Sequence, residues 1–173
     1  TLDIVNSADE PIFIDVFLEG DFPSEFRRLQ DETRQLLEEF SDENSNIKFG
    51  FINPLEDETV RDQNLQLLVE RGLTPMRLSV QENGKSSEEI IIPWALASYG
   101  ETTVEIPLIK NKIGANQQEL VTNSVQHLEY AFADGFSKLV NPKRRKIAVL
   151  RGNGQLENKN IADFVTTLRD YYY

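Results

Sequence analysis

The sequence predicts a mixed α/β domain whose elements follow the order strand, helix, strand, helix, strand, strand, helix. An almost continuous apolar run at residues 12–18 is typical of a buried strand. Apolar residues three or four positions apart over residues 22–40 indicate an amphipathic helix. Later, Asn83-Gly84 between two strand-like runs indicates a hairpin, and helical spacing returns over residues 116–139. Together these patterns predict a sheet that contains both parallel and antiparallel strands.

The first half of the chain is expected to fold as strand, helix, strand, helix. Pro23 suits the first turn of the helix that follows residues 12–18. Residues 47–52 predict the second strand, and residues 57–71 predict a helix that ends at Gly72. Because a strand–helix–strand unit strongly favours a right-handed parallel crossover, we expect the first two strands to be parallel.

The middle of the chain is expected to form an antiparallel meander. Its strands are predicted at residues 76–80, along a long apolar arm at residues 90–99, and at residues 102–108. Pro93 and Pro107 indicate bulges or positions on an edge strand, since proline has no N–H to donate to a neighbouring strand. A long helix over residues 116–139, bent or frayed at Gly135, should then lie across the sheet.

A domain boundary is expected after residue 141. Residues 1–141 would form the first domain, and residues 142–173 a linker and the start of a second, truncated α/β domain. That start would consist of a strand at residues 147–150 and one helix. One strand and one helix cannot bury a core, so this piece either docks on the first domain or begins another.

Composition excludes several classes of function. The chain has 173 residues, 29 of them acidic and 18 basic, and its formal charge of -11 opposes nonspecific binding to nucleic acid. It has no cysteine and one histidine, which excludes disulfides, thiol nucleophiles, thiolate metal sites and multi-histidine zinc sites. No run approaches the ~20 apolar residues of a membrane-spanning helix.

Motifs for catalysis are weak. Gly152-x-Gly154 follows a strand-like run, but Glu157 occupies the place of the third glycine of a dinucleotide site. His127 lies within a predicted helix, and no strained serine loop accompanies it. We therefore predict a non-enzymatic protein without a cofactor or metal.

The element order resembles that of the thioredoxin-like fold. The segment GLTPMRLSVQENGK, residues 72–85, resembles the thioredoxin segment in which a cis-proline introduces an apolar strand and an Asn-Gly hairpin. Residues 14–23 lie where thioredoxins carry the Cys-x-x-Cys motif at a helix start. No cysteine is present there, so the resemblance implies the scaffold without its redox chemistry.

A longer resemblance covers nearly the whole chain. The strings FLEGDFPSEFRRLQDETRQLLEEF, GLTPMRLSVQENGKSSEEIIIPWALASYG, NSVQHLEYAFADGFSKL and KIAVLRGNG resemble the gliding-motility-associated ABC transporter substrate-binding family of Bacteroidetes, known as GldG. The resemblance implies a segment on the periplasmic side of the inner membrane, anchored by helices that this sequence does not contain. It also implies an auxiliary role beside a transporter permease and an ATPase, in gliding motility and secretion. The region from residue 147 would begin that family's second α/β domain.

Two groups of residues are candidates for contact with partners. The aromatic side chains of Phe22, Phe26, Trp94 and Tyr99 could line a groove, with residues 90–99 as an exposed edge for another chain or a second copy. The second group is the dense basic run of the linker. It consists of Lys143, Arg144, Arg145 and Lys146. A solvated linker is the simpler interpretation of this run, and contact with lipid headgroups or an acidic partner is the alternative.

Two functional hypotheses follow from the sequence. The first is a module that acts through protein–protein contacts within a transporter complex. The alternative is a module of the same transporter that binds a glycan or peptide in a groove between the two domains.

Overall fold

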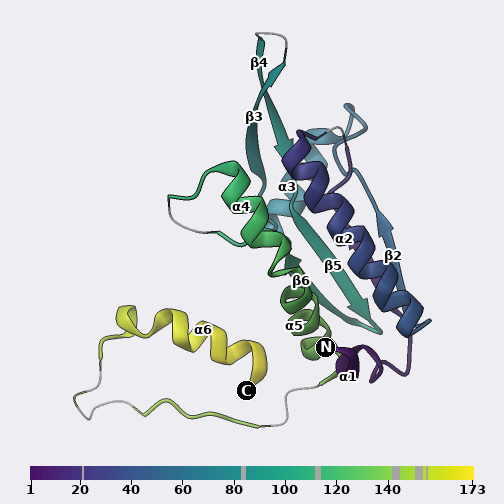
Figure 1. Ribbon diagram of the computed structural model, residues 1–173. Helices are drawn as coiled ribbons and strands as arrows, with labels where there is room; N and C mark the ends of the chain where they lie inside the picture. Colours follow the sequence, from purple (N-terminus) through teal and green to yellow (C-terminus); the bar gives the residue numbers. More distant parts are fainter. Residues whose placement is uncertain (21, 83–84, 112–113, 142–144, 151–153, 155) are drawn as a thin grey trace.

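The computed structural model describes residues 1–173 except 21, 83–84, 112–113, 142–144, 151–153 and 155 (Figure 1). Its described strands form a four-stranded mixed sheet and a separate two-stranded sheet. The larger sheet has the order β2-β1-β5-β6. These strands are β1 (Ile12–Val16), β2 (Ile47–Phe51), β5 (Trp94–Tyr99) and β6 (Thr102–Pro107). The predicted mixed α/β class is therefore confirmed.

Strand pairing follows the predicted combination of parallel and antiparallel neighbours. β1 and β2 are parallel, with Ile14 opposite Phe49, as expected of a strand–helix–strand unit. β5 runs antiparallel to β1 on one side and to β6 on the other. Consequently β5 lies inside the sheet, while β2 and β6 lie at its two edges.

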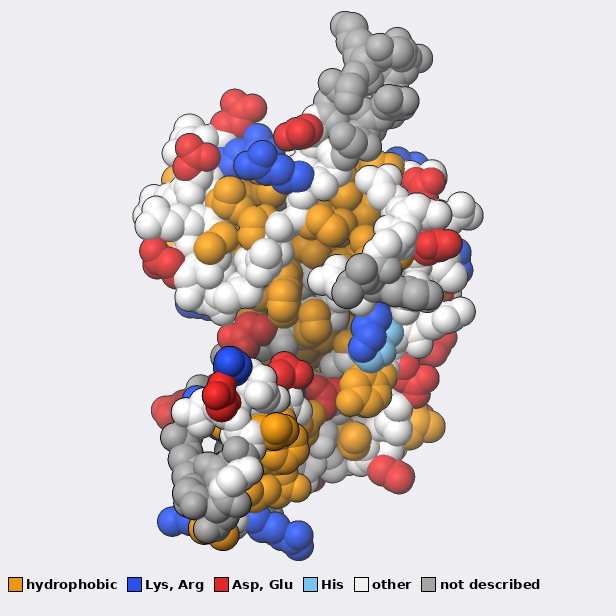
Figure 2. All heavy atoms as spheres, turned by 90° about the vertical axis from the view of Figure 1, so that its left-hand side faces the viewer, with side chains coloured by type: hydrophobic (Ala, Val, Ile, Leu, Met, Phe, Trp, Pro, Cys, Tyr) orange, Lys and Arg blue, Asp and Glu red, His pale blue; other side chains and the backbone are white. Residues whose placement is uncertain are grey.

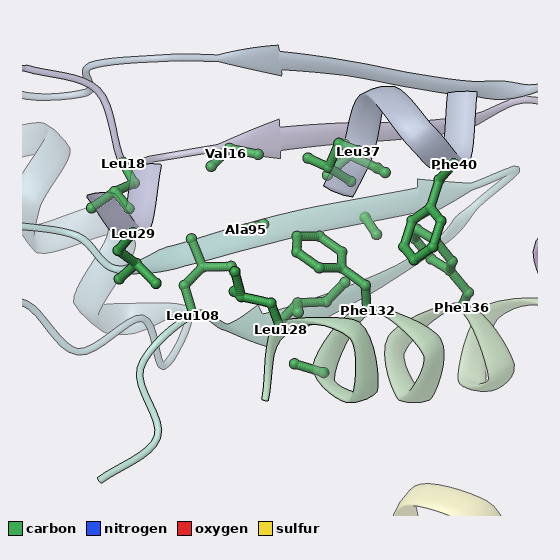
Figure 3. Close-up of a cluster of buried hydrophobic side chains, with 14 of the residues drawn as sticks. Val16, Leu18, Leu29, Leu37, Phe40, Ala95, Leu108, Leu128, Phe132 and Phe136 are labelled. Atoms are coloured by element: carbon green, nitrogen blue, oxygen red, sulfur yellow. The ribbon is translucent and has the colours of Figure 1, made fainter. Parts of the chain in front are cut away.

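The main core lies between one face of this sheet and the helices α2 (Ser24–Glu43), α4 (Gln117–Val125) and α5 (Leu128–Val140). α2 buries Phe26, Leu29, Thr33, Leu37 and Phe40, at the spacing of one helical face. Figure 3 shows side chains of α2 and α5 meeting over the strands, with Phe40 and Phe136 as an edge-to-face pair at 5.9 Å between ring centroids.

The N-terminal segment closes one end of this core. It contains α1 (Leu2–Val5), whose Val5 is buried against the core. The Asn44 side-chain amide donates hydrogen bonds to the carbonyls of Val5 at 2.7 Å and Ala8 at 3.2 Å. The end of α2 is thereby tied to the residues that precede β1.

The predicted long helix is two helices, and its interruption does not fall at Gly135. The break falls at Gln126 and His127, between α4 and α5. Ser124 lies one turn earlier, where its hydroxyl donates to the Leu120 carbonyl at 2.7 Å and accepts from the Lys110 N–H at 2.8 Å. A serine that bonds back to its own helix often bends it, and here it also ties the helix to the preceding loop.

The predicted meander is divided between two sheets. β3 (Met76–Glu82) and β4 (Lys85–Ile91) pair with each other as a hairpin that projects from the body (Figure 1). The Asn83-Gly84 turn lies outside the described residues, but the pairing of Glu82 with Lys85 on either side of it confirms the hairpin. β3 is thus not the strand that follows the second helix into the main sheet.

The implied cis-proline is also corrected. The described residues contain no cis peptide bond, and the proline next to the central strand is Pro93 rather than Pro75. Pro93 directly precedes β5, whereas Pro75 precedes the hairpin strand β3. The strand and hairpin that the resemblance implied after Pro75 are present, and the thioredoxin-like arrangement stays a prediction.

The second face of the sheet is covered at one end by α3 (Arg61–Glu70). A small core there contains Leu55, Leu68, Leu73, Ile92 and Leu96, with Trp94 packed against it. Away from α3 this face is exposed at Phe13 of β1, which leaves 60% of its surface accessible. α3 ends as predicted at Gly72, whose φ of +89° is a left-handed conformation that favours glycine.

The C-terminal residues form a helix without the predicted strand. The expected strand at residues 147–150 is wrong for the described structure, where the segment belongs to no sheet and Leu150 is 77% exposed. α6 (Ala162–Tyr171), preceded by the short helix η1 (Asn158–Asn160), is present. The Tyr173 N–H donates to the Arg145 carbonyl and the Ile147 N–H to the Tyr173 carbonyl, both at 3.0 Å, as in a parallel bridge.

A side chain of α6 links this C-terminal segment to the main body. The Tyr171 hydroxyl donates a hydrogen bond to Asp134 of α5, and the Lys138 ammonium lies 5.1 Å from the Tyr171 ring centroid. The division into domains at residues 141 and 142 stays a prediction. No helix among the described residues is long and apolar enough to span a membrane.

Close packing of α5 on the sheet predicts the effect of one added methyl group. A Cβ at Gly135 would lie 2.6 Å from Cδ1 and 2.7 Å from Cγ1 of the buried Ile106. We expect Gly135→Ala to lower the free energy of unfolding by about 1–2 kcal/mol in urea denaturation, since overpacking outweighs the gain in helix propensity.

The matched control is the same substitution in an Ile106→Ala background, where the obstructing atoms are absent. There Gly135→Ala should leave stability unchanged or raise it. An equal loss of stability in both backgrounds would show that the contact with Ile106 is not the cause.

Candidate functional site

A groove runs along the outer edge of β6, between the end of α3 and α5. Its volume is about 480 Å³. Figure 2 shows this side of the molecule, where hydrophobic side chains are exposed among polar ones. The groove is lined by Arg71, Gly72, Trp94, Thr102, Thr103, Val104, Glu105 and Lys138. It therefore combines the free edge of a strand with one aromatic and several charged side chains.

The backbone of β6 presents hydrogen-bonding groups to this groove. In an antiparallel pair, alternate residues direct their N–H and C=O groups toward the neighbouring strand. The Leu108 N–H donates to the Pro93 carbonyl at 2.9 Å. Every second residue counted back from Leu108 along β6 therefore directs its backbone N–H and C=O groups toward β5. The backbone groups of Thr103 and Glu105 accordingly point outward, away from β5.

Pro107 limits the length of this edge. It occupies the next outward position after Glu105 and has no N–H, so the edge offers donors at Thr103 and Glu105 but not at Pro107. The sequence indicated either a bulge or an edge strand for Pro107, and its position on β6 confirms the edge strand. The described strands supply no second neighbour for β6.

Trp94 forms one wall of the groove and is held in a fixed orientation. Its indole N–H donates to the Thr74 carbonyl at 3.0 Å, and its ring packs half-buried on the small core under α3. The side chain can thus offer an apolar surface without an unsatisfied polar atom. It is also the only tryptophan of the chain, so its fluorescence reports on this groove.

Charged side chains stand on both sides of the edge. The Lys138 ammonium is 2.9 Å from Oδ2 of Asp134, the same carboxylate that accepts from Tyr171. The hydrogen bond from Tyr171 to Asp134, together with burial, raises the pKa of Tyr171 to about 12. On the opposite wall, the Arg71 side chain is exposed and forms no ion pair with any described residue.

The four aromatic residues predicted to share one surface do not do so. Phe26 is completely buried and Phe22 nearly so, both in the main core, so neither can line an exposed groove. Tyr99 is half-buried at the opposite end of β5 from Trp94. Trp94 is the member of the set that reaches the groove.

The predicted edge is likewise displaced by one strand. β5, which contains most of the apolar arm, is paired on both sides and cannot accept another chain. The edge strands are β2 and β6, and β6 is the one that follows the apolar arm in the chain. Polar residues at Thr102, Thr103 and Glu105, followed by Pro107, were the sequence signal for an edge, but strand order is not readable from one sequence.

The basic run of the linker is only partly described. Lys143 and Arg144 lie outside the described residues, while Arg145 and Lys146 are exposed. Its proposed contact with lipid or an acidic partner stays a prediction. Glu157, which argued against a dinucleotide site, pairs with Lys159 at 2.8 Å, and Gly152 lies outside the described residues.

His127 shows no arrangement for catalysis. Its ring stacks on Tyr130 at 4.9 Å between centroids, and the nearby Ser124 hydroxyl is occupied by two backbone groups. Burial and the positive charge of Lys110 lower the pKa of His127, against an opposing effect of Asp134. The part of the chain that the structure describes contains no group of three metal-ligating side chains.

One comparison with known proteins identifies a family. The model of the family described as "Domain of unknown function (DUF7088)" matches residues 1–98. The chain belongs to this family. No curated protein and no solved structure matches the chain. The DUF7088 match includes Arg71 and Trp94 but ends before β6, so it covers one wall of the groove and not the strand edge.

Titration of the single histidine tests the electrostatics beside α5. We expect the pKa of His127 to lie below the ordinary value of 6.5, so that the imidazole is neutral at pH 7. The imidazole of the unfolded chain then binds a proton more readily than that of the folded chain. His127 therefore stabilises the fold above pH 6.5, and this contribution is lost as the pH falls through the lowered pKa of the folded state.

The measurement is an NMR titration of the imidazole resonances, which belong to one residue because the chain has one histidine. Lys110→Gln should raise the pKa of His127, and Asp134→Asn should lower it further. A value at or above 6.5, or no response to Lys110→Gln, would contradict the assigned causes.

Proposed function

We propose that this DUF7088 protein is a non-enzymatic interaction module that binds an extended segment of a partner protein along the edge of β6. The observation that carries the proposal is the free edge itself, with the backbone groups of Thr103 and Glu105 directed into a groove. Strand addition of this kind obtains affinity from main-chain hydrogen bonds and specificity from alternate side chains.

The surroundings of the edge support docking of a strand. Thr102, Thr103 and Glu105 are exposed, and described strands leave room beside them. Trp94 adds an apolar wall, and aromatic residues dominate the binding energy of many interfaces. The open side of β6 is short, as edge strands of soluble proteins generally are, and Pro107 limits its pairing.

The wider setting of the proposal comes from the family resemblance of the sequence. We propose that the module belongs to an auxiliary component of an ABC transporter, anchored on the periplasmic side of the inner membrane and active in gliding motility or secretion. Its partners would be the permease and ATPase subunits. This setting rests on the resemblance of the sequence strings, whereas the docking edge rests on the geometry.

Glycan binding is the second candidate for the same groove. The observation in its favour is that the half-buried Trp94 ring lines the same groove as the exposed polar residues Thr102 and Thr103. A glycan would not require the N–H of an outward-facing residue on β6. Loss of that N–H therefore separates the two candidates.

Removal of one backbone donor tests the proposed function. The full-length membrane protein is purified with its permease and ATPase subunits, as wild type and as Glu105→Pro, which deletes the outward N–H of the edge. Glu105→Ala is the matched control, because it removes the carboxylate and keeps the N–H. We expect recovery of both subunits with wild type and Glu105→Ala, and at least a tenfold loss with Glu105→Pro.

Equal recovery with Glu105→Pro would exclude the β6 edge as the contact. Failure to recover the permease and ATPase with the wild-type protein would exclude the transporter setting. Far-ultraviolet circular dichroism and the urea midpoint of the purified variants show whether the proline substitution has unfolded the domain, in which case Thr103→Pro provides the second test of the edge.

A further inference from the structure

We infer that the partner segment carries an acidic side chain, which binds Arg71, next to an apolar side chain that packs on Trp94. The inference rests on the proposed function, because it names the chemistry of the segment that would dock along β6. It follows from the side chains that line the α3 side of the groove and from the absence of an ion pair between Arg71 and any described acidic residue.

Arg71 and Glu105 lie on the same side of the sheet. Glu105 is opposite Leu96 in the pairing of β5 with β6, and Leu96 belongs to the small core under α3. Arg71 is the residue that ends α3 over this core. A strand added to β6 would place every second side chain on this side, between Arg71, Glu105 and Trp94.

Arg71 is the cation of the groove that the described structure leaves available. Lys138, on the opposite side, is already paired with Asp134 and lies over the Tyr171 ring. Arg71 instead has an exposed guanidinium and no ion pair with Glu105 or another described acid, although acidic residues outnumber basic ones 29 to 18 in this chain. Its five N–H donors suit a carboxylate in a bidentate geometry.

A purely structural role explains Arg71 less well. A cation at a helix C-terminus interacts favourably with the helix dipole, and this interaction requires only that the cation lie near the last turn. It does not account for the exposed guanidinium in a groove that also holds a fixed tryptophan and a free strand edge. The combination of the three provides main-chain, apolar and charged contacts for one extended segment.

A second copy of the chain is the less favoured occupant. Each copy carries a formal charge of -11, so two copies repel one another, whereas a short segment brings few charges. A single acidic side chain next to Arg71 gains local attraction despite the net charge, because distant charges are screened at physiological salt beyond about 8 Å.

The test uses a displayed random peptide library, selected on the immobilised protein and on its Glu105→Pro variant. We expect enriched peptides with β-branched residues and an Asp or Glu at one fixed position next to an apolar residue. Synthetic versions with Glu or Gln at that position are then titrated by the fluorescence of Trp94. The Glu peptide should bind about two- to fivefold more tightly than the Gln peptide at physiological salt.

Variants of Arg71 separate the acidic preference from docking itself. Arg71→Gln should abolish the preference for Glu over Gln, and Arg71→Glu should reverse it in favour of a Lys peptide, while the Gln peptide binds as before. Glu105→Gln is the matched charge control and should increase the preference for Glu, since it removes a nearby negative charge.

The outcomes distinguish the two levels of the proposal. Peptides that depend on the Glu105 N–H but show no acidic position, or an acidic preference unchanged by Arg71→Glu, would overturn the role of Arg71 and leave strand docking intact. Absence of enrichment over the bare matrix, or enrichment equal on Glu105→Pro, would overturn both. A concentration-dependent dimer in analytical ultracentrifugation, abolished by Glu105→Pro, would replace the peptide by a second copy.

Discussion

The structure depends on the position of β5 at the centre of the main sheet. This strand pairs with β1 on one side and β6 on the other, and its two faces supply both cores. Ala95 and Ala97 face the main core, where their small side chains leave room for the large residues of α2 and α5. Trp94 and Leu96 face the second core under α3. The alternation of side chains along a strand thus links the two layers of helices through six residues.

The central position of β5 also decides where the protein can meet a partner. Because β5 is hydrogen-bonded to β1 on one side and to β6 on the other, the outer edge on the β6 side of the sheet is formed by β6. This strand is short and ends at Pro107. The close approach of α5, allowed by Gly135 over Ile106, holds β6 in the sheet while its outer backbone groups stay free. The groove and its tryptophan are therefore consequences of the same packing that stabilises the domain.

Local patterns predicted most elements of this fold but not their arrangement. The run at residues 12–18, the spacing of α2 and the Asn83-Gly84 signal gave β1, the helix and the hairpin because each depends on neighbouring residues. The same patterns failed for residues 147–150, where an apolar run stays exposed without a sheet partner. They also failed for the candidate surface, since Phe22 and Phe26 have the composition of contact residues and are buried. Of the predicted contact set, Trp94 lines the groove, and Arg71 had no signal apart from its place before Gly72.

The sequence by itself determined the classes of element, the parallel opening unit, the acidic charge and the lack of thiol chemistry, because periodicity, turn residues and composition are properties of the chain. Tertiary structure alone decided that β5 lies inside the sheet, that β6 lies at its edge, that the helix predicted over residues 116–139 breaks at Gln126 and His127, and that Arg71 and Trp94 line one groove. These features arise from contacts between residues far apart in the chain, where the burial of apolar side chains and the pairing of strands select one arrangement among several that the local patterns allow.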